Sequence, residues 1–191
     1  MAGKDLPTPE TLRELLSYDP DTGLLTWHHR PIEIFPDERT FKSWNTKHAD
    51  KEAFTATSAQ GYRGGKIFCV RHEAHRVAWA VHHGAWPAKQ IDHINGNKTD
   101  NRITNLRDVS PTENLRNAVT YSTNTSGVCG VSWRKEPCKW VAQITLSGKA
   151  CHLGYFADFD DAVAARKAAE VKYGFHPNHG RPALAKNSHL P

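Results

Sequence analysis

The stretch of sequence that decides the fold is IDHINGNKTDNRITNLRDVSPTENLRN, which occupies residues 91–117. It predicts a short strand over 90–94 and a second short strand over 106–109. Between them lies a loop, 95–105, that is dense in Asn, Asp and Gly, the residues that favour tight turns. The stretch therefore predicts two short strands joined by a polar loop.

A helix is predicted directly after the second strand. Ser110 is a favourable N-cap, Pro111 suits the first helical position, and Glu113 completes a capping box three residues after the serine. Asn114 then lies one turn into this helix. Strand, loop, strand and helix thereby bring three or four polar side chains toward one place, within a core motif over 90–117.

The polar side chains of this motif suit the hydrolysis of a phosphodiester. Asp92 and His93 are neighbours at the end of a strand, where neighbouring residues point to opposite faces unless the strand bends. The carboxylate of Asp92 and the amide oxygen of Asn114 are ligands that a hard cation such as Mg²⁺ prefers, with phosphate oxygen and water completing its shell. His93 is the local side chain whose pKa suits a general base, and Asn105 could either fix its ring or pin the loop.

The motif resembles the HNH nuclease family, also called the ββα-metal or His-Me finger nucleases. The likeness is to the phage and intron-encoded homing endonucleases whose last motif residue is asparagine. It extends from about 18 to 117 and rests on YDPDTGLLTW at 18–27, GY at 61–62, AHRVAWAVHHGAWP at 74–87 and DHINGNKTDNRITNLR at 92–107.

The resemblance implies a role for each motif residue. Asp92 and Asn114 bind the metal, His93 is the general base, and Asn105 orients that histidine. It also implies Mg²⁺-dependent cleavage or nicking of DNA, with Mn²⁺ as a possible substitute. Zinc-stabilised members of the family carry C-x-x-C pairs, and this chain has none, so no structural zinc is expected.

Some of these roles have alternatives within the same motif. Asn101 could take the role given to Asn105, and Asn117 the role given to Asn114. Asp100 is the next candidate if the metal ligands lie elsewhere.

Basic residues near the motif are candidate DNA contacts. We expect Arg76, Arg102 and Arg107 to bind DNA. His75 and Arg76 could equally serve to pack the predicted helix over 73–83 instead of binding phosphate.

The rest of the N-terminal region carries weaker signals. The stretch 30–60 has no clear period and is predicted to be an ordered, irregular loop with short strands. The remaining predicted elements are a helix over 10–16, a turn over 17–23, a strand over 24–27 and a strand over 66–70.

A polar segment, YSTNTS at 121–126, is the predicted domain boundary. It separates a nuclease region, 1–120, from a second domain, 121–175, and a flexible tail, 176–191. The second domain is predicted to hold three antiparallel strands and one packed helix, over 128–133, 140–146, 150–156 and 159–173.

One face of this second sheet is basic and aromatic, which suits contact with DNA, although the tryptophans could equally be core residues. The predicted contacts are Trp133, Arg134, Lys135, Lys139, Trp140 and Gln143.

The second domain resembles the DNA-binding domain of plant ethylene-response factors, which also occurs fused to phage HNH endonucleases. The likeness covers about 124–175 and rests on GVSW at 130–133, KWVAQI at 139–144, HLGYF at 152–156 and the alanine-rich helix. Arg134 and Gln143 match contact positions of that family. Other contact positions differ, so its base preference does not transfer; they hold Cys129, Ser132, Thr145, Ala150 and His152.

Composition limits the class of protein. The 191 residues are 38% hydrophobic and 24% charged, with a net charge of +5 at pH 7, which permits a packed core and a nucleic-acid partner. No apolar run is long enough for a membrane span, and the first residues do not resemble a secretory signal. We expect a cytoplasmic protein, in the host cytoplasm if it is encoded by a phage.

Together these observations predict a two-domain α+β endonuclease that acts on double-stranded DNA. A ββα-metal nuclease region cuts, and a three-stranded sheet with one helix holds the DNA. A homing or other mobile-element role and a monomeric state are expected. The alternatives are a DNA-binding regulator with an inactive nuclease fold and a nuclease directed at RNA.

Overall fold

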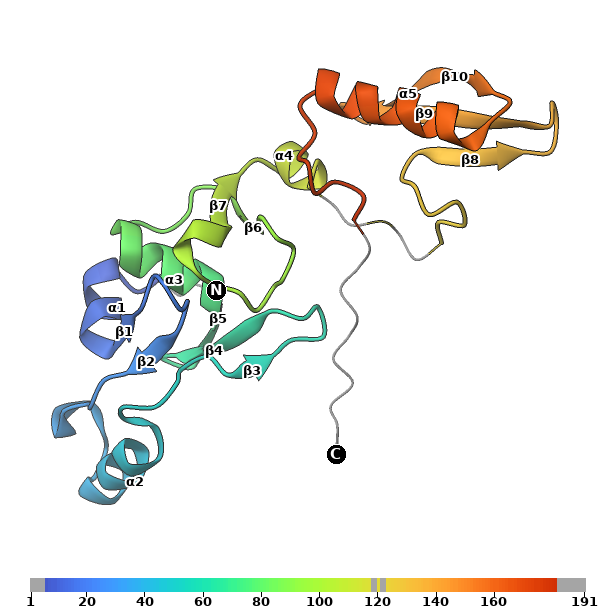
Figure 1. Ribbon diagram of the computed structural model, residues 1–191. Helices are drawn as coiled ribbons and strands as arrows, with labels where there is room; N and C mark the ends of the chain where they lie inside the picture. The colour runs from blue at the N-terminus through green and yellow to red at the C-terminus, as the bar shows by residue number, and fades with distance from the viewer. Residues whose placement is uncertain (1–5, 118–119, 121–122, 182–191) are drawn as a thin grey trace, which may run out of the picture. The chain divides into compact units, whose positions relative to one another are not determined.

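The computed structural model describes residues 6–117, 120 and 123–181. It divides into two compact units, Met1–Asp108 and Val109–Pro191, and each of them mixes helices and strands as the predicted α+β class requires (Figure 1). No helix in these described ranges is both long and apolar enough to cross a membrane.

The division falls earlier in the chain than the predicted boundary at 121–126, of which residues 121–122 lie outside the described part. Helix α4 (Pro111–Leu115) groups with the C-terminal elements instead of with the nuclease strands. The reason is a set of hydrogen bonds that tie the end of α4 to the segment after the last helix. The backbone N–H of His176 donates to the carbonyl of Arg116 at 3.2 Å, and Arg181 Nη1 donates to Asn117 Oδ1 at 2.7 Å.

The first unit packs three α-helices against small sheets. Strand β1 pairs antiparallel with β2, β3–β4–β5 form an antiparallel sheet, and β6 pairs with β7. Its elements are α1 (Pro9–Leu15), β1 (Leu16–Tyr18), β2 (Leu25–Trp27), η1 (Ile32–Ile34), α2 (Glu38–His48), β3 (Ala56–Thr57), β4 (Arg63–Ile67), β5 (Val70–Glu73), α3 (Ala74–His83), β6 (Gln90–His93), η2 (Ile103–Asn105) and β7 (Leu106–Val109).

The core of this unit lies between α1, α3 and the short strands. Leu12 of α1 and Val77 of α3 are completely buried, and the two helices lie side by side (Figure 1). Tyr18 contacts this core and also a second cluster that contains Ile91 and Leu106 of the paired strands β6 and β7. One aromatic side chain therefore connects the helical core to the strands that carry the motif.

The prediction of irregular structure over 30–60 was wrong for part of the segment, because α2 is an eleven-residue helix. The side chain of Asp37 caps it by accepting a hydrogen bond from the backbone N–H of Thr40 at 2.7 Å. Phe41, Trp44 and His48 lie on one side of the helix at intervals of three and four residues. These residues give only a weak hydrophobic pattern, so the sequence did not predict this helix, which aromatic packing stabilises.

The single strand predicted over 66–70 is instead a tight hairpin. Ile67 ends β4 and pairs with Val70 at the start of β5, so the chain reverses within two residues. Phe68 and Cys69 form this turn with φ of 49° and 64°. Such turns normally carry Asn or Gly, and without those residues the sequence gives no turn signal.

The second unit contains the predicted three-stranded antiparallel sheet and its helix. The strands are β8 (Val131–Arg134), β9 (Lys139–Leu146) and β10 (Lys149–Phe156), with β9 in the centre. Helix α5 (Phe159–Lys172) packs on β9 and β10, and Ala162 is completely buried beside Val131. This prediction of the elements is confirmed, with boundaries shifted by up to three residues.

The two tryptophans of the sheet share one face. Trp133 lies directly opposite Trp140 in the register of β8 and β9, and directly opposed residues point to the same side. Trp140 packs on Phe159 of α5 with ring centres 4.7 Å apart, so this is the helix-covered face. Arg134 is opposite Lys139 in the next position and lies on the other face.

The predicted flexible tail begins too early. Residues 176–181 fold back on the unit, and His179 is buried against Arg166, with Nε2 accepting a hydrogen bond from Nη2 at 3.1 Å. The remainder of the predicted tail, 182–191, lies outside the described residues.

Candidate active site

The motif strands β6 and β7 bring the candidate catalytic residues into a largely buried site. Asp92 and His93, at the end of β6, are only 8% and 3% exposed. A buried carboxylate and a buried imidazole need partners, because an unpaired polar group away from water is costly. The two side chains have different partners, as expected for neighbours on a strand.

Asp92 forms an ion pair with Arg107 on the adjacent strand. Its Oδ2 atom accepts hydrogen bonds from Nε at 2.9 Å and from Nη2 at 2.6 Å. Arg107 was predicted as a DNA contact, and in this structure its guanidinium holds the carboxylate. The pair fixes the position of the oxygen atoms that the sequence assigned to a metal.

His93 is oriented by Asn101, one of the two candidates for this role. Its Nε2 atom donates to Asn101 Oδ1 at 3.2 Å, and Asn101 itself is buried. This tautomer places the lone pair on Nδ1. Burial lowers the pKa of His93, while Asn101 and Asp92 oppose that effect, so the neutral imidazole is favoured near neutral pH.

The prediction that Asn105 orients His93 was therefore wrong, and Asn105 pins the loop instead. Its Oδ1 accepts from the backbone N–H of Asn95 at 2.9 Å, and its Nδ2 donates to the carbonyl of Asp100 at 2.8 Å. Both atoms of the amide form hydrogen bonds across the loop, and among the described residues none of its hydrogen bonds goes to the imidazole. This was the second role considered for Asn105.

A turn far away in the sequence supports the loop that carries Asn101. The hydroxyl of Tyr18 donates to the carbonyl of Asn101 at 2.7 Å, and the backbone N–H of Ile103 donates to the carbonyl of Pro20 at 3.1 Å. Gly23 has φ of 76°, and a Cβ there would lie 2.5 Å from the backbone nitrogen of Arg102. Glycine is needed because the two backbones touch. The segment 18–23 thus holds the orienting asparagine in place.

The rings of His75 and Tyr62 pack near the ring of His93. The ring of His75 is 5.2 Å from that of His93 in an edge-on arrangement, and Tyr62 lies 5.0 Å from His75 and 5.9 Å from His93. Burial lowers the pKa of His75 to about 3, and His93 and Arg76 add to the effect. Of the two roles considered for His75, packing is the one observed.

The remaining motif ligand belongs to the other unit. Asn114 lies in α4, and the predicted capping box between Ser110 and Glu113 is confirmed. Since Asp92 lies in the first unit, joint binding of a metal by Asp92 and Asn114 stays a prediction.

The donor chemistry of the site fits a hard divalent cation. Asp92 supplies carboxylate oxygen, and Asn114 would supply an amide oxygen, the ligand types that Mg²⁺ prefers together with water and phosphate. The described residues contain no cluster of three or more His, Cys, Asp or Glu side chains that could hold a metal.

The other predicted DNA contacts fall into two groups. Near the motif, Arg102 is paired with Asp100 at 2.6 Å, which lowers the pKa of that carboxyl group to about 2, and Arg76 Nη1 donates to the carbonyl of Lys89 at 3.2 Å. On the second unit, the exposed predicted contacts are Trp133, Arg134, Lys135, Lys139 and Gln143.

Known proteins place the chain in a family. A segment of 85 residues, 44% of this chain, is 41% identical to "Protein 3.8" of Escherichia phage T7 and covers 70% of that protein. Residues 72–116 match the family described as HNH endonuclease. The chain belongs to the HNH endonuclease family. The matched HNH domain contains every residue predicted for catalysis and metal binding, and no solved structure matches the chain.

Proposed function

We propose that this HNH protein is a metal-dependent endonuclease that hydrolyses phosphodiester bonds of double-stranded DNA. The observation that carries the proposal is the buried Asp92–His93 pair, in which each side chain is held by its own partner, Arg107 or Asn101. Preorganised groups of this kind are what hydrolysis requires, because they cost no rearrangement during the reaction.

His93 is the general base in this proposal. The hydrogen bond between Nε2 and Asn101 fixes the ring, and in this proposal Nδ1 takes a proton from water. The activated water attacks phosphorus, and the bond to the leaving oxygen breaks. Asn101 is a positioning residue, and His75 with Tyr62 supports the ring from behind.

Asp92 and Asn114 would hold the divalent cation. When bound, Mg²⁺ supplies positive charge that stabilises the phosphoryl oxygens and the leaving oxygen. Arg107 keeps the Asp92 carboxylate in place, and a guanidinium so close to the site can also bind a phosphate oxygen of the substrate.

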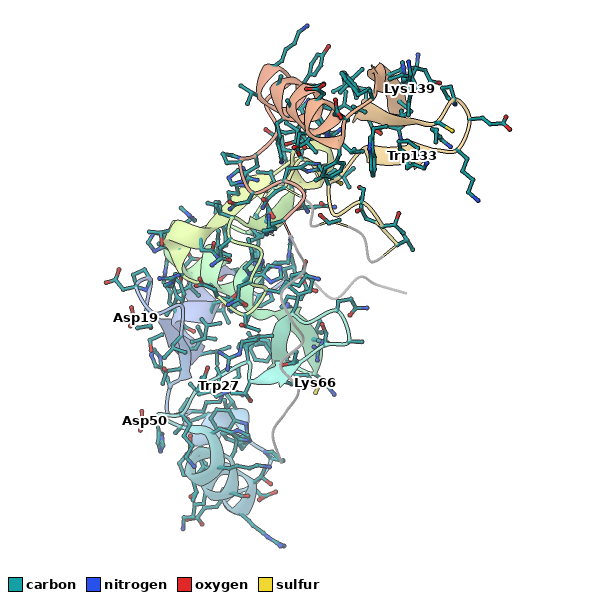
Figure 2. All side chains as sticks on the ribbon, turned by 45° about the vertical axis from the view of Figure 1, so that its right-hand side comes forward. Asp19, Trp27, Asp50, Lys66, Trp133 and Lys139 are labelled. Atoms are coloured by element: carbon teal, nitrogen blue, oxygen red, sulfur yellow. The ribbon has the colours of Figure 1, made fainter. Side chains whose placement is uncertain are left out.

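The C-terminal sheet would hold the DNA. Arg134, Lys139 and Gln143 are exposed, and register places Arg134 and Lys139 on the face that α5 does not cover. The side chains of this unit extend from both sides of the sheet, with Trp133 and Lys139 labelled on β8 and β9 (Figure 2). This arrangement supports a DNA-binding role similar to that of the plant ethylene-response factors. A role in homing or in another mobile element is proposed from the similarity to a phage protein.

Digestion of supercoiled plasmid tests the proposal. We expect nicked or linear DNA with Mg²⁺ or Mn²⁺ and intact plasmid with EDTA. A labelled RNA duplex in competition distinguishes the two nucleic acids. Binding of plasmid without cleavage in any divalent cation would favour the inactive, DNA-binding alternative.

A further inference from the structure

A polar cavity lies in the first unit. It is lined by elements other than the motif strands β6 and β7. It has a volume of about 300 Å³ and lies between β2, the start of the 28–37 segment, α2 and β4. Its walls include Trp27, Trp44, Arg30 and Lys66 (Figure 2, which labels Trp27 and Lys66). Figure 1 shows α2 at the end of the unit that is remote from β6 and β7.

Arg30 is held rigidly in the wall of this cavity. Its guanidinium carbon lies 3.9 Å from the ring centre of Trp44 and 5.0 Å from that of Trp27. Asn45 of α2 fixes the backbone of Arg30 from both sides, because its amide bonds the N–H and the carbonyl of that residue at 2.9 Å each. The planar cation is therefore in a fixed orientation before any ligand arrives.

The guanidinium has no acidic partner in the part of the chain that the structure describes. No ion pair or hydrogen bond involves its side-chain nitrogens there, and Nε is buried without a partner. Buried N–H donors normally have partners, so an unpaired guanidinium in a cavity wall is suited to an acceptor that enters the cavity. Arginine presents five donors in a planar fork that suits phosphate oxygens.

The charges around the cavity also favour an anion. Burial lowers the pKa of His48 in the cavity wall, and the nearby charges of Lys47, Arg30 and Lys51 lower it further. Glu52 is the acid among the described residues that line the cavity, and it is paired with Arg63 at 2.6 Å. The charged residues that line the cavity are Arg30 and Lys66 against the paired Glu52, so the local charge is positive.

We propose that the cavity at Arg30 binds a phosphate group of the DNA backbone, as an anchor separate from the catalytic residues. The ligand chemistry is a phosphate between a stacked guanidinium and Lys66 at the exposed rim. The choice of DNA as its source rests on the proposed function. A free phosphate or nucleotide would present the same chemistry.

The test compares Arg30→Gln with Lys42→Gln in the full-length protein. Lys42 is on the neighbouring helix α2, is exposed, and pairs with Glu38 at 2.7 Å, so its substitution removes the same charge outside the cavity. Affinity for duplex DNA is measured in EDTA over a range of salt concentrations. We expect Arg30→Gln to weaken binding about tenfold and to reduce the slope of log K against log salt by about one unit. Lys42→Gln should change the slope by much less.

A second variant and a second ligand allow the proposal to be tested even if Arg30→Gln does not fold. If Arg30→Gln proves unstable in thermal unfolding, Lys66→Gln at the exposed rim takes its place. This variant should also weaken binding to duplex DNA. The Nε–H signal of Arg30 in nitrogen-15 NMR should shift with duplex DNA. A shift of this signal with inorganic phosphate, and none with duplex DNA, would overturn the assignment to the DNA backbone.

Two outcomes separate this inference from the nuclease proposal. If wild type cuts plasmid but Arg30→Gln and Lys66→Gln bind DNA with the slope of Lys42→Gln, the anchor is wrong and Arg30 only packs on the tryptophans. If wild type neither binds nor cuts DNA, both proposals fail.

Discussion

In the HNH domain the chemically important side chains are buried and fixed by partners, whereas on the C-terminal sheet the cations are exposed. Asp92 is held by Arg107 and His93 by Asn101. Arg134 and Lys139 have no ion pair within the described residues. Under the proposed function the difference is a division of labour, because catalysis needs fixed geometry and phosphate binding needs cations that can exchange water and ions for DNA.

The largest expected effect is the loss of the base. His93→Ala should reduce the cleavage rate by about 10²–10⁴ and leave the affinity for duplex DNA unchanged. Single-turnover cleavage of plasmid and a binding titration measure the two quantities. His82→Gln, at an exposed position of α3, is the matched control. Cleavage by His93→Ala within about threefold of wild type would end the assignment of the base.

Substitution of the two loop asparagines, Asn101 and Asn105, should have different effects. Asn101→Ala should lower the cleavage rate by about 10- to 100-fold, because the imidazole loses its orientation. Asn105→Ala should lower the free energy of unfolding by about 1–3 kcal/mol, because two part-buried backbone groups lose a partner. Rate measurements and urea unfolding on both variants check this. The opposite pattern would return the orienting role to Asn105.

The buried ring behind the base should make stability depend on pH. The pKa of His75 is about 3 in the fold, against about 6.5 unfolded, so between these values only the unfolded chain takes up the proton. The free energy of unfolding should therefore fall as pH decreases from 6.5 toward 3, by up to about 1.4 kcal/mol per pH unit from this group. The charged or titratable groups that surround it are Arg76, Glu73, Tyr62 and His93.

Urea unfolding at pH 7 and pH 5 measures this dependence. His75→Gln should show a shallower decrease than wild type, and His82→Gln should follow wild type. An equal decrease in all three proteins would mean that His75 is protonated in the fold.

The smallest expected effect concerns the exposed sheet. Arg134→Gln and Lys139→Gln should each reduce the slope of log K against log salt by about one unit, with no change in the cleavage rate at saturating enzyme. The matched control is Lys172→Gln at the end of α5. If both substitutions leave the slope unchanged, the face does not contact DNA, and the contrast between the two units loses its functional meaning.

The sequence alone was sufficient for elements that are determined by local signals. The capping box at Ser110, the two motif strands and the three strands with one helix of the second unit follow from residue type and spacing within a few positions. Such signals act over one turn or one strand, so they are readable without knowing the rest of the fold.

Tertiary structure alone decided how the site is assembled. Asn101, and not Asn105, reaches His93 because the irregular loop is held by Tyr18 and Gly23, about 80 residues earlier in the chain. The direction of a side chain in a loop depends on backbone contacts that no local pattern encodes. The pairing of Asp92 with Arg107 likewise depends on which residues of adjacent strands face each other. The sequence therefore determined which chemical groups are present, and packing between distant segments determined which of them meet.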